Sequence, residues 1–177
     1  MVSVANILGE ALVRKKMEQE LYEREEKYRD LYNNAPNGYL SVDVEGLIIR
    51  CNKQVGELLK YKTEELLGWP VLDLYADTPF GKTKAKDILR QFQKGNSVRN
   101  EELQMQKSDG SIVWVSLSVT PVRDTKGQVL ESRSVVVDIS GRKQTEKALL
   151  ESEEKYRLVI ETLPNWITIS DAEGNLI

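Results

Sequence analysis

Histidine is absent from this chain of 177 residues, and cysteine occurs once, at Cys51. Without histidine, the chain has no imidazole for acid–base catalysis, for a catalytic triad, for phosphotransfer, or for binding haem or zinc. A single cysteine excludes an internal disulfide and a thiolate metal cluster. No apolar run approaches the roughly 18 residues that cross a membrane as a helix. We therefore expect no catalytic site, no metal site and no membrane contact in this segment.

The composition fits one folded domain with some chain left over. Hydrophobic residues make up 40% of the sequence and charged residues 30%, so a core can form beneath a well-solvated surface. The formal net charge of -3 argues against a general nucleic-acid-binding role. The N-terminus lacks the basic stretch and unbroken apolar run of a secretory signal. We expect a cytoplasmic protein, or the cytoplasmic portion of a membrane-attached sensor.

An internal repeat relates the two ends of the chain. Residues 25–29, Glu-Glu-Lys-Tyr-Arg, recur as residues 153–157, and Pro36-Asn37 recurs at the same offset as Pro164-Asn165. Eleven identities fall in the 25 positions from Glu25 to Ile49, which is too many for coincidence. We therefore predict one complete unit followed by the start of a second, as in a fragment of a tandem array.

A long helix is predicted before the first unit, because residues 5–33 contain no proline and are dense in Glu, Lys, Arg and Leu. Mostly apolar positions recur in it with the heptad spacing of a coiled coil. This stripe of positions is either the apolar face of a solvated amphipathic helix that lies on its own domain or the interface of a coiled coil with another chain. We favour the coiled-coil interface. Its members are Met17, Leu21, Arg24, Tyr28, Leu31 and Ala35, repeated as Thr145, Leu149, Ser152, Tyr156, Val159 and Leu163.

Five strands are predicted after Pro36. Leu40, Val42 and Val44 alternate with polar residues and should share one face, and Glu45-Gly46 should turn this strand into residues 47–51. Successive valines from Val135 to Val137 predict a last strand that is apolar on both faces, whose second face a flanking helix or a partner subunit must cover. The other expected strands are residues 98–107, 111–122 and 129–139.

Short helices are predicted between the second and third strands. Asn52 should cap a helix that runs through Leu59, and Thr63 should cap another through Leu67. A further helix is expected over residues 80–94, where Gly95-Asn96 ends it.

This order of elements resembles a PAS domain with its C-terminal PAC motif. Residues 52–68 resemble the PAS stretch that begins with Asn and runs through a helix to Tyr, an acidic pair, Leu and Gly. Residues 107–110, Lys-Ser-Asp-Gly, followed by Trp114-Val115, resemble the PAC turn and strand. Residues 138–143 resemble the exit signature Asp-Ile-Thr-Glu-Arg-Lys, with Ser for Thr and Gly for Glu. The resemblance implies an α+β fold: a five-stranded antiparallel sheet of order 2-1-5-4-3, with short helices on one face and long flanking helices.

Four segments follow from the repeat and the resemblance. We expect residues 1–34 to form an N-terminal linker or coiled-coil helix, residues 35–140 the PAS domain with its PAC motif, and residues 141–163 a linker signalling helix. We expect residues 164–177 to be the truncated start of a second PAS domain, poorly ordered or paired opportunistically.

The resemblance also implies a small ligand cavity between sheet and helices. Asn52 has the simpler role of a helix cap, and Cys51 precedes it at a strand end rather than in the Asn-Cys-Arg helix of flavin-adduct photosensors. Haem-binding members generally use histidine, so no cofactor is required by the sequence, and the identity of any ligand stays open. The pocket candidates are Leu40, Val42, Cys51, Asn52, Leu59, Tyr61, Trp69, Glu101, Leu103, Met105, Val115, Leu117 and Val137.

Glu101 raises a separate question, because it shares the strand parity of Leu103 and Met105. If those two residues face the cavity, Glu101 points inward too, where an unpaired carboxylate would be costly. It either contacts a ligand or lies near the strand end and reaches a Lys, an Arg or solvent, and we favour the second reading.

We expect a non-enzymatic sensory and dimerisation module of a signal-transduction protein, such as a sensor histidine kinase of a two-component system. It would form a homodimer through its flanking helices, bind a small molecule or a partner, and pass the signal to a downstream kinase or other output domain. The expected signal-transfer residues are Asp138, Ile139, Ser140 and Arg142 at the strand-to-helix junction. The alternatives are a ligand-free dimerisation scaffold and a flavin- or haem-binding PAS sensor, whereas no motif supports a carboxylate enzyme.

Overall fold

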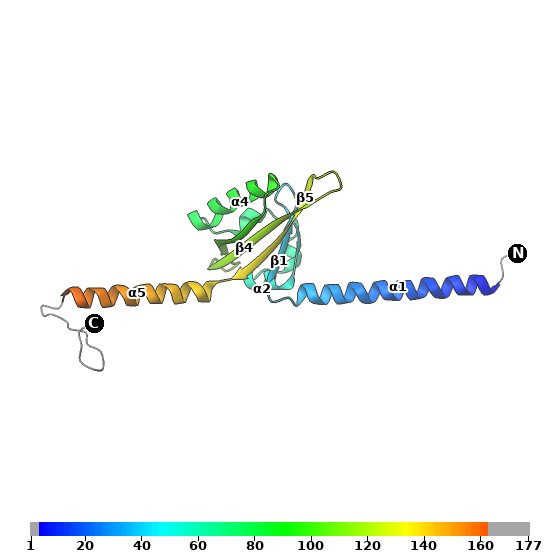
Figure 1. Cartoon of the computed structure of the whole chain (residues 1–177), viewed down its shortest axis with the longest axis horizontal. Coiled ribbons are helices and arrows are strands. Elements are labelled where there is room, and N and C mark those ends of the chain that lie inside the picture. Colours follow the sequence, from blue (N-terminus) through cyan, green and yellow to red (C-terminus); the bar gives the residue numbers. More distant parts are fainter. Residues whose placement is uncertain (1–3, 163–177) are drawn as a thin grey trace, which may run out of the picture. The chain divides into compact units, whose positions relative to one another are not determined.

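The computed structural model of the chain describes residues 4–162, with side-chain burial from Leu12 onward (Figure 1). The chain divides into two compact units, Met1–Asp138 and Ile139–Ile177. The expected start of a second PAS domain at residues 164–177 lies outside the described residues.

Both long helices predicted from the charge-rich segments are present. Helix α1 spans Val4–Asn33 in the first unit, and helix α5 spans Ser140–Thr162 in the second. Helix α5 has no buried residue. Within residues 4–162, neither of these nor any other helix is apolar over a length that could cross a membrane.

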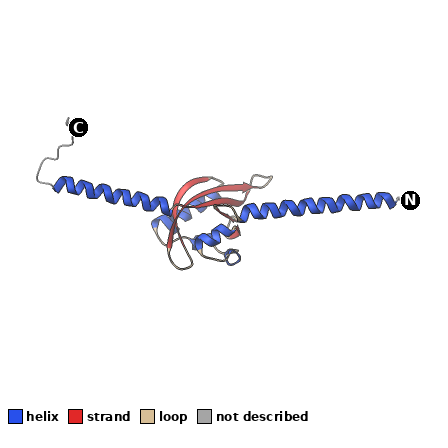
Figure 2. Cartoon of the chain, turned by 90° about the horizontal axis from the view of Figure 1, so that it is seen from below, coloured by secondary structure: helices blue, strands red, loops and turns tan. Residues whose placement is uncertain are grey.

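The first unit contains one antiparallel sheet, in the order β2-β1-β5-β4-β3 that the resemblance implied. Its strands curve over the short helices (Figure 2). The long pairing of β4 with β5 runs from Val115 opposite Asp138 to Arg123 opposite Val129. The strands are β1 (Gly38–Val42), β2 (Ile48–Cys51), β3 (Val98–Gln106), β4 (Ile112–Arg123) and β5 (Val129–Asp138).

Short helical segments connect β2 to β3 and cover the inner face of the sheet. The expected cap at Asn52 is present, but Thr63 is the first residue of its helix and Lys62 occupies the cap position without a side-chain hydrogen bond. The helix expected over residues 80–94 begins only at Lys84, because Gly81 has φ -102° and ψ -108°, outside the helical region. The segments are α2 (Lys53–Leu59), α3 (Thr63–Leu66), η1 (Val71–Leu74), η2 (Pro79–Thr83) and α4 (Lys84–Gln93).

The hydrophobic core lies between the inner face of the sheet and these short helices. Helix α4 buries Ala85, Ile88 and Phe92, which lie on one side of an α-helix because they are spaced by three and four residues. From the sheet, Leu103 and Met105 of β3 are completely buried. One core therefore holds both layers together.

Two strand positions differ from the alternation expected from the sequence. Val44 is 43% exposed, because β1 ends at Val42 and the Asp43 carboxylate accepts hydrogen bonds from the backbone N–H groups of Glu45 and Leu47, both at 2.9 Å, to form the turn. On β5 it is Val136 that faces the core, whereas Val137 is 36% exposed on the other face. The expectation that Val137 lines the cavity is therefore wrong.

Candidate functional site

A cavity of about 30 Å³ lies between the sheet and helices η1 and α4. This volume has room for about two water molecules and is roughly one tenth of the smallest volume usual for small-molecule sites. A ligand of any size would require the walls to move. The lining residues are Leu40, Val42, Val71, Tyr75, Ala85, Ile88, Leu89, Phe92, Leu117, Val119, Ser132 and Ser134.

Two buried serines on β5 make the polar part of the cavity wall. Ser132 is fully buried and Ser134 is 6% exposed. The Ser132 hydroxyl accepts a hydrogen bond from the Val42 backbone N–H at 3.0 Å and lies 3.2 Å from the Ser134 hydroxyl. Both hydroxyls point from β5 into the cavity. The same strand ends at Asp138, two residues before α5 begins, so β5 contributes polar groups to the cavity wall and also leads to α5.

Tyr75 brings a third hydroxyl-bearing side chain to this wall from the end of η1. It is 5% exposed, and burial raises the pKa of its phenol. The phenol therefore stays neutral at physiological pH, where it can donate as well as accept a hydrogen bond.

Asn52 connects four backbone segments through its side-chain amide. Its Oδ1 accepts hydrogen bonds from the N–H groups of Tyr39, at 2.8 Å, and Val55, at 3.3 Å. Its Nδ2 donates to the carbonyl oxygens of Tyr32, at 2.9 Å, and Asn37, at 3.0 Å. Each polar atom of the fully buried amide thus has two partners, and α1, the following loop, β1 and α2 meet at this residue.

Three tyrosine rings continue the attachment of α1 to the sheet. Tyr28 stacks on Tyr32 at 5.9 Å between ring centroids, and Tyr32 stacks on Tyr39 of β1 at 5.8 Å. Partial burial raises the pKa of Tyr32 to about 12. The last turns of α1 are therefore packed against the domain to which they lead.

Beside these rings the outer face of the sheet has a groove of about 780 Å³. We call it the outer groove, and it opens on the side of the sheet opposite the cavity. Arg50 and Glu131 form an ion pair at its edge. Its walls are formed by Tyr28, Leu31, Tyr32, Tyr39, Leu40, Ser41, Arg50, Glu131, Arg133, Ser134 and Val135.

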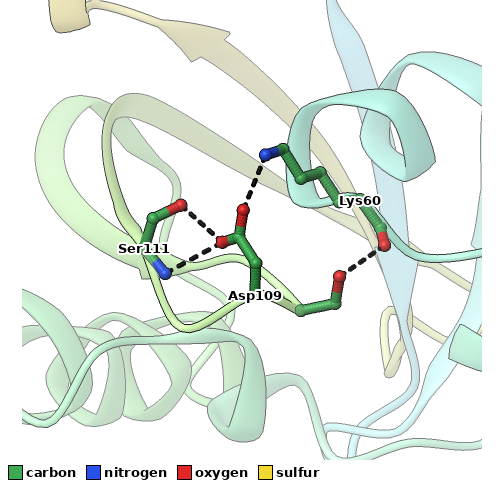
Figure 3. A network of polar contacts seen from close by, with 4 residues as sticks. Lys60, Asp109 and Ser111 are labelled. Carbon is green, nitrogen blue, oxygen red and sulfur yellow. Dashed lines mark hydrogen bonds and ion pairs between the residues drawn. The ribbon is translucent and has the colours of Figure 1, made fainter.

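The turn between β3 and β4 is attached to the end of α2 (Figure 3). Lys60, in the left-handed conformation at φ 60°, places its Nζ 2.6 Å from Asp109 Oδ2. The other carboxylate oxygen accepts hydrogen bonds from the backbone N–H and hydroxyl of Ser111, at 2.9 and 2.6 Å. The Ser108 hydroxyl donates to the Lys60 carbonyl oxygen at 2.6 Å. The hydrogen bond from Lys60, followed by those from Ser111, holds the pKa of the Asp109 carboxyl well below its usual range.

The structure brings only part of the predicted pocket set to the cavity. Leu40, Val42 and Leu117 line it. Cys51 is half-buried at the end of β2, where its thiol lies 3.6 Å from the Thr63 carbonyl oxygen and burial raises the thiol pKa. The members that are buried elsewhere in the domain, without lining the cavity, are Asn52, Leu59, Leu103, Met105 and Val115.

Three further members of the predicted set lie outside the cavity lining. Tyr61 and Trp69 contact each other edge to face at 5.5 Å, and Trp69 is 39% exposed. Glu101 forms an ion pair with Lys84 at 2.6 Å, which is the alternative that the sequence favoured.

Sequence reasoning missed the cavity residues of η1, α4 and β5. For Ser132 and Ser134 a signal existed, because they share the strand parity of Val136, but the run of three valines concealed which face is buried. Tyr75 follows a single helical turn, whose short length leaves no periodic pattern in the sequence.

The predicted signal-transfer residues lie at the boundary of the two units. Asp138 ends β5 opposite Val115, and Ser140 begins α5. The Lys143 N–H donates to the Ile139 carbonyl oxygen at 3.0 Å, which closes the first helical turn, and Arg142 lies 3.8 Å from Glu146.

Comparison with known proteins places these features in context. A profile of the PAS domain family matches residues 36–141. The chain is 26% identical over 156 residues to sporulation kinase E of Bacillus subtilis, a match that covers 87% of this chain and 20% of the kinase. It is 28% identical over 133 residues to sensor protein TdiS of Thauera aromatica, covering 75% of this chain and 24% of that protein. The chain thus spans about a fifth to a quarter of the length of these curated relatives.

Among solved structures, the fold is similar to the PAS domain of an HTR-like protein from Haloarcula marismortui. The TM-score is 0.60 at 21% sequence identity, with 71% of this chain and 99% of that chain covered. At this identity the likeness concerns the fold alone.

Proposed function

Because the chain belongs to the PAS domain family, we propose that it is a sensory and dimerisation module of a signal-transduction protein, and that it has no catalytic role of its own. A small molecule or a partner would favour one of two arrangements of the sheet, and its effect would equal the difference between its affinities for them. The output domain would belong to the rest of the parent protein.

One observation supports this relay most directly: a single strand both lines the cavity and precedes the exit helix. Ser132 and Ser134 of β5 face the cavity, and the same strand reaches Asp138, two residues before α5 begins. A change at the serine pair therefore has a short covalent path to Ser140. Displacement of β5 would alter the first turn of α5, as in other switches in which one element shifts against its neighbours.

The curated relatives support a kinase as the parent. One is named a sporulation kinase and the other a sensor protein, and this chain spans only a small part of each. We propose a sensor histidine kinase, located in the cytoplasm or on the cytoplasmic side of a membrane. The phosphate-accepting histidine would lie in another part of it, because this chain contains none.

The repeated sequence supports a second PAS domain after α5. Residues 153–157 repeat residues 25–29 of α1, and Tyr28 of that segment stacks on Tyr32, which in turn stacks on Tyr39 of the domain. We propose that the end of α5 packs in the same way against the domain that follows it.

A thermal-shift screen combined with hydrogen exchange tests the sensory role. Small molecules are added to the purified chain, and compounds that raise its unfolding temperature are kept, since only ligands of the folded state do so. Such a compound should slow amide exchange in β5 and change it in the first turns of α5. Ser134→Thr, which adds one methyl group to a space of about 30 Å³, should abolish the shift.

The control for this screen is Ser116→Thr on β4, which makes the same chemical change away from the cavity lining and should leave the shift intact. If no compound raises the unfolding temperature, sensing of a small molecule is contradicted, and sensing of a partner or the scaffold role remains. If a compound does so without changing exchange in α5, the relay is wrong.

A ligand-free dimerisation scaffold is the second candidate function, and the small size of the cavity favours it. The same melting experiment separates the two candidates. A flavin or haem sensor receives less support, because a volume of about 30 Å³ accommodates neither group and the Cys51 thiol lies against the Thr63 carbonyl oxygen rather than in the cavity.

A further inference from the structure

We propose that the cavity takes a small neutral carbonyl compound, such as a short-chain ketone or aldehyde, whose oxygen accepts hydrogen bonds from the β5 serine pair and from Tyr75. This inference rests on the sensory part of the proposed function and specifies the chemical class of the ligand. Three properties of the lining support it: its unpaired hydroxyl protons, its lack of charge and its small volume.

The paired serines of β5 have one hydroxyl proton more than their partners can accept. The hydroxyls of Ser132 and Ser134 lie 3.2 Å apart, and the Val42 N–H donates to Ser132. Their mutual hydrogen bond uses one hydroxyl proton, whichever serine donates it. The other proton has no acceptor among residues 4–162, although both serines are buried. The pair therefore offers a proton to whatever occupies the cavity.

Tyr75 adds a second hydroxyl without a partner. Its side chain lines the cavity and is 5% exposed, and its hydroxyl makes no hydrogen bond within the part of the chain that the structure describes. Buried polar groups in native proteins are almost always hydrogen-bonded, and an unpaired donor costs free energy. A carbonyl oxygen has two lone pairs, so one ligand atom has the capacity for a proton from the serine pair and a proton from Tyr75.

The remaining lining favours an uncharged ligand with an apolar body. No residue of the described lining is Lys, Arg, Asp or Glu, and apart from the two serines and Tyr75 its side chains are apolar. An ionised carboxylate or ammonium group would lose its hydration here without gaining an opposite charge. The lining therefore favours a ketone or an aldehyde over a carboxylate of the same size.

The volume of the cavity limits the ligand to a few non-hydrogen atoms. About 30 Å³ has room for about two water molecules, so a molecule of the size of butanone requires one wall to give way. Leu89 of α4 is the lining residue at which this is cheapest, because it is half-buried whereas the other lining residues are buried. Rotation of the Leu89 side chain toward solvent would open the cavity and enlarge it.

Binding of three compounds of similar shape to the full chain tests the ligand class. Butanone presents a carbonyl oxygen. In its hydrocarbon isostere a CH2 group replaces this oxygen, and in propionate an ionised oxygen replaces a methyl group. NMR titration of the backbone amides of β5 and η1 measures each dissociation constant. Butanone should bind at least about tenfold more tightly than either of the other two, because only butanone pairs the hydroxyl protons without burying a charge.

Tyr75→Phe removes one of the donors and keeps the aromatic ring. The affinity for butanone should fall about tenfold, whereas the affinity for the hydrocarbon isostere should not fall. Because the Tyr75 hydroxyl has no partner in the described chain, the variant should unfold at the same urea concentration as the wild type. Tyr61→Phe is the matched control, since Tyr61 contacts Trp69 outside the cavity lining, and it should bind butanone as the wild type does.

The outcomes separate the ligand class from the function on which it rests. Equal affinities for butanone and its hydrocarbon isostere, equally tight binding of propionate, or an affinity for butanone that Tyr75→Phe leaves unchanged would overturn the ligand class. A chain that binds none of the three but responds to other compounds in the thermal-shift screen would also overturn it, while small-molecule sensing stands. A chain that binds no compound at all, with water only in its cavity, would contradict small-molecule sensing and the ligand class together.

Discussion

Asn52 connects α1 to the domain with a single side chain, and its loss should be costly. Asn52→Ala removes the buried side-chain partner of the Tyr39 and Val55 N–H groups and of two carbonyl oxygens, and Val55 keeps only its 3.2 Å hydrogen bond to the backbone carbonyl oxygen of residue 52. We expect the free energy of unfolding to fall by about 2–4 kcal/mol, measured by urea denaturation.

Asn34→Ala is the control for that experiment. Asn34 is exposed, and its removal should change the unfolding free energy by less than about 0.5 kcal/mol. Equal effects of the two variants would show that the four hydrogen bonds of Asn52 do not contribute to stability.

Asp109 should make the attachment of the β3–β4 turn sensitive to acid. Its pKa is lowered in the folded state, first by the hydrogen bond from Lys60 and then by those from Ser111. The ionised carboxylate therefore stabilises the fold above the unfolded-state pKa of about 3.9, and this contribution is lost as the pH falls through the lower folded-state pKa.

Carboxyl titration by NMR measures this effect directly. Wild-type Asp109 should titrate well below its ordinary range, and Lys60→Met, which keeps the aliphatic stem, should move the pKa upward. An ordinary pKa for Asp109 in the wild-type chain would show that the contact with Lys60 does not persist in solution.

Residue identity predicted some of these roles and missed others for reasons of geometry. Asn52 was predicted as a helix cap because Asn before a helical stretch accepts hydrogen bonds from the first turn. Its hydrogen bond to the Tyr32 carbonyl oxygen was not predictable, because the sequence does not show that the end of α1 lies next to the start of α2. Glu101 has the strand parity of a buried residue. Its carboxylate is not unpaired, however, because Lys84 at the start of α4 forms an ion pair with it.

At the scale of elements, the turn η2 depends on Gly81. A Cβ at this position would lie 2.1 Å from the Ala76 carbonyl oxygen and 3.0 Å from that of Gln104, and backbone atoms of this kind cannot move aside cheaply. Gly81→Ala should therefore lower the free energy of unfolding by about 2–4 kcal/mol.

Gly141 in the first turn of α5 provides the matched comparison for Gly81. A Cβ there meets no atom within 4 Å, so Gly141→Ala should be neutral or stabilise by up to about 1 kcal/mol through helix propensity. If Gly81→Ala proves equally harmless in urea denaturation, η2 is not confined as the structure indicates.

Periodicity predicted the elements well, and local backbone geometry explains the exceptions. Alternation located β4, with Val113, Val115, Leu117 and Val119 all buried, whereas the sheet order was implied by the resemblance to the PAS family. The apolar pattern predicts too early a start for α4, because the backbone conformation of Gly81 has no signature in that pattern. It also predicts that Val44 belongs to β1, because the alternation continues into a turn that the Asp43 side chain closes.

At the scale of the whole molecule, fold and association should be separable. A chain that begins at Tyr28 loses most of α1 but keeps the tyrosine stacking and the Asn52 hydrogen bonds. We expect its domain to unfold with a free energy within about 1 kcal/mol of the full chain when both are compared as monomers.

The shortened chain should also be monomeric by sedimentation equilibrium, because it lacks Met17, Leu21 and Arg24 of the stripe. A dimer of unchanged affinity would place the main interface elsewhere on the domain. Loss of the fold itself would mean that the domain depends on more of α1 than its last turns.

The exposed surface of α5 has a consequence for how such proteins can grow. Because no residue of α5 is buried and the stripe recurs in the sequence after one unit, duplication of a whole unit would leave the hydrophobic core of this domain intact. If the proposed second PAS domain follows α5, an array of such units could lengthen or shorten by complete modules during evolution.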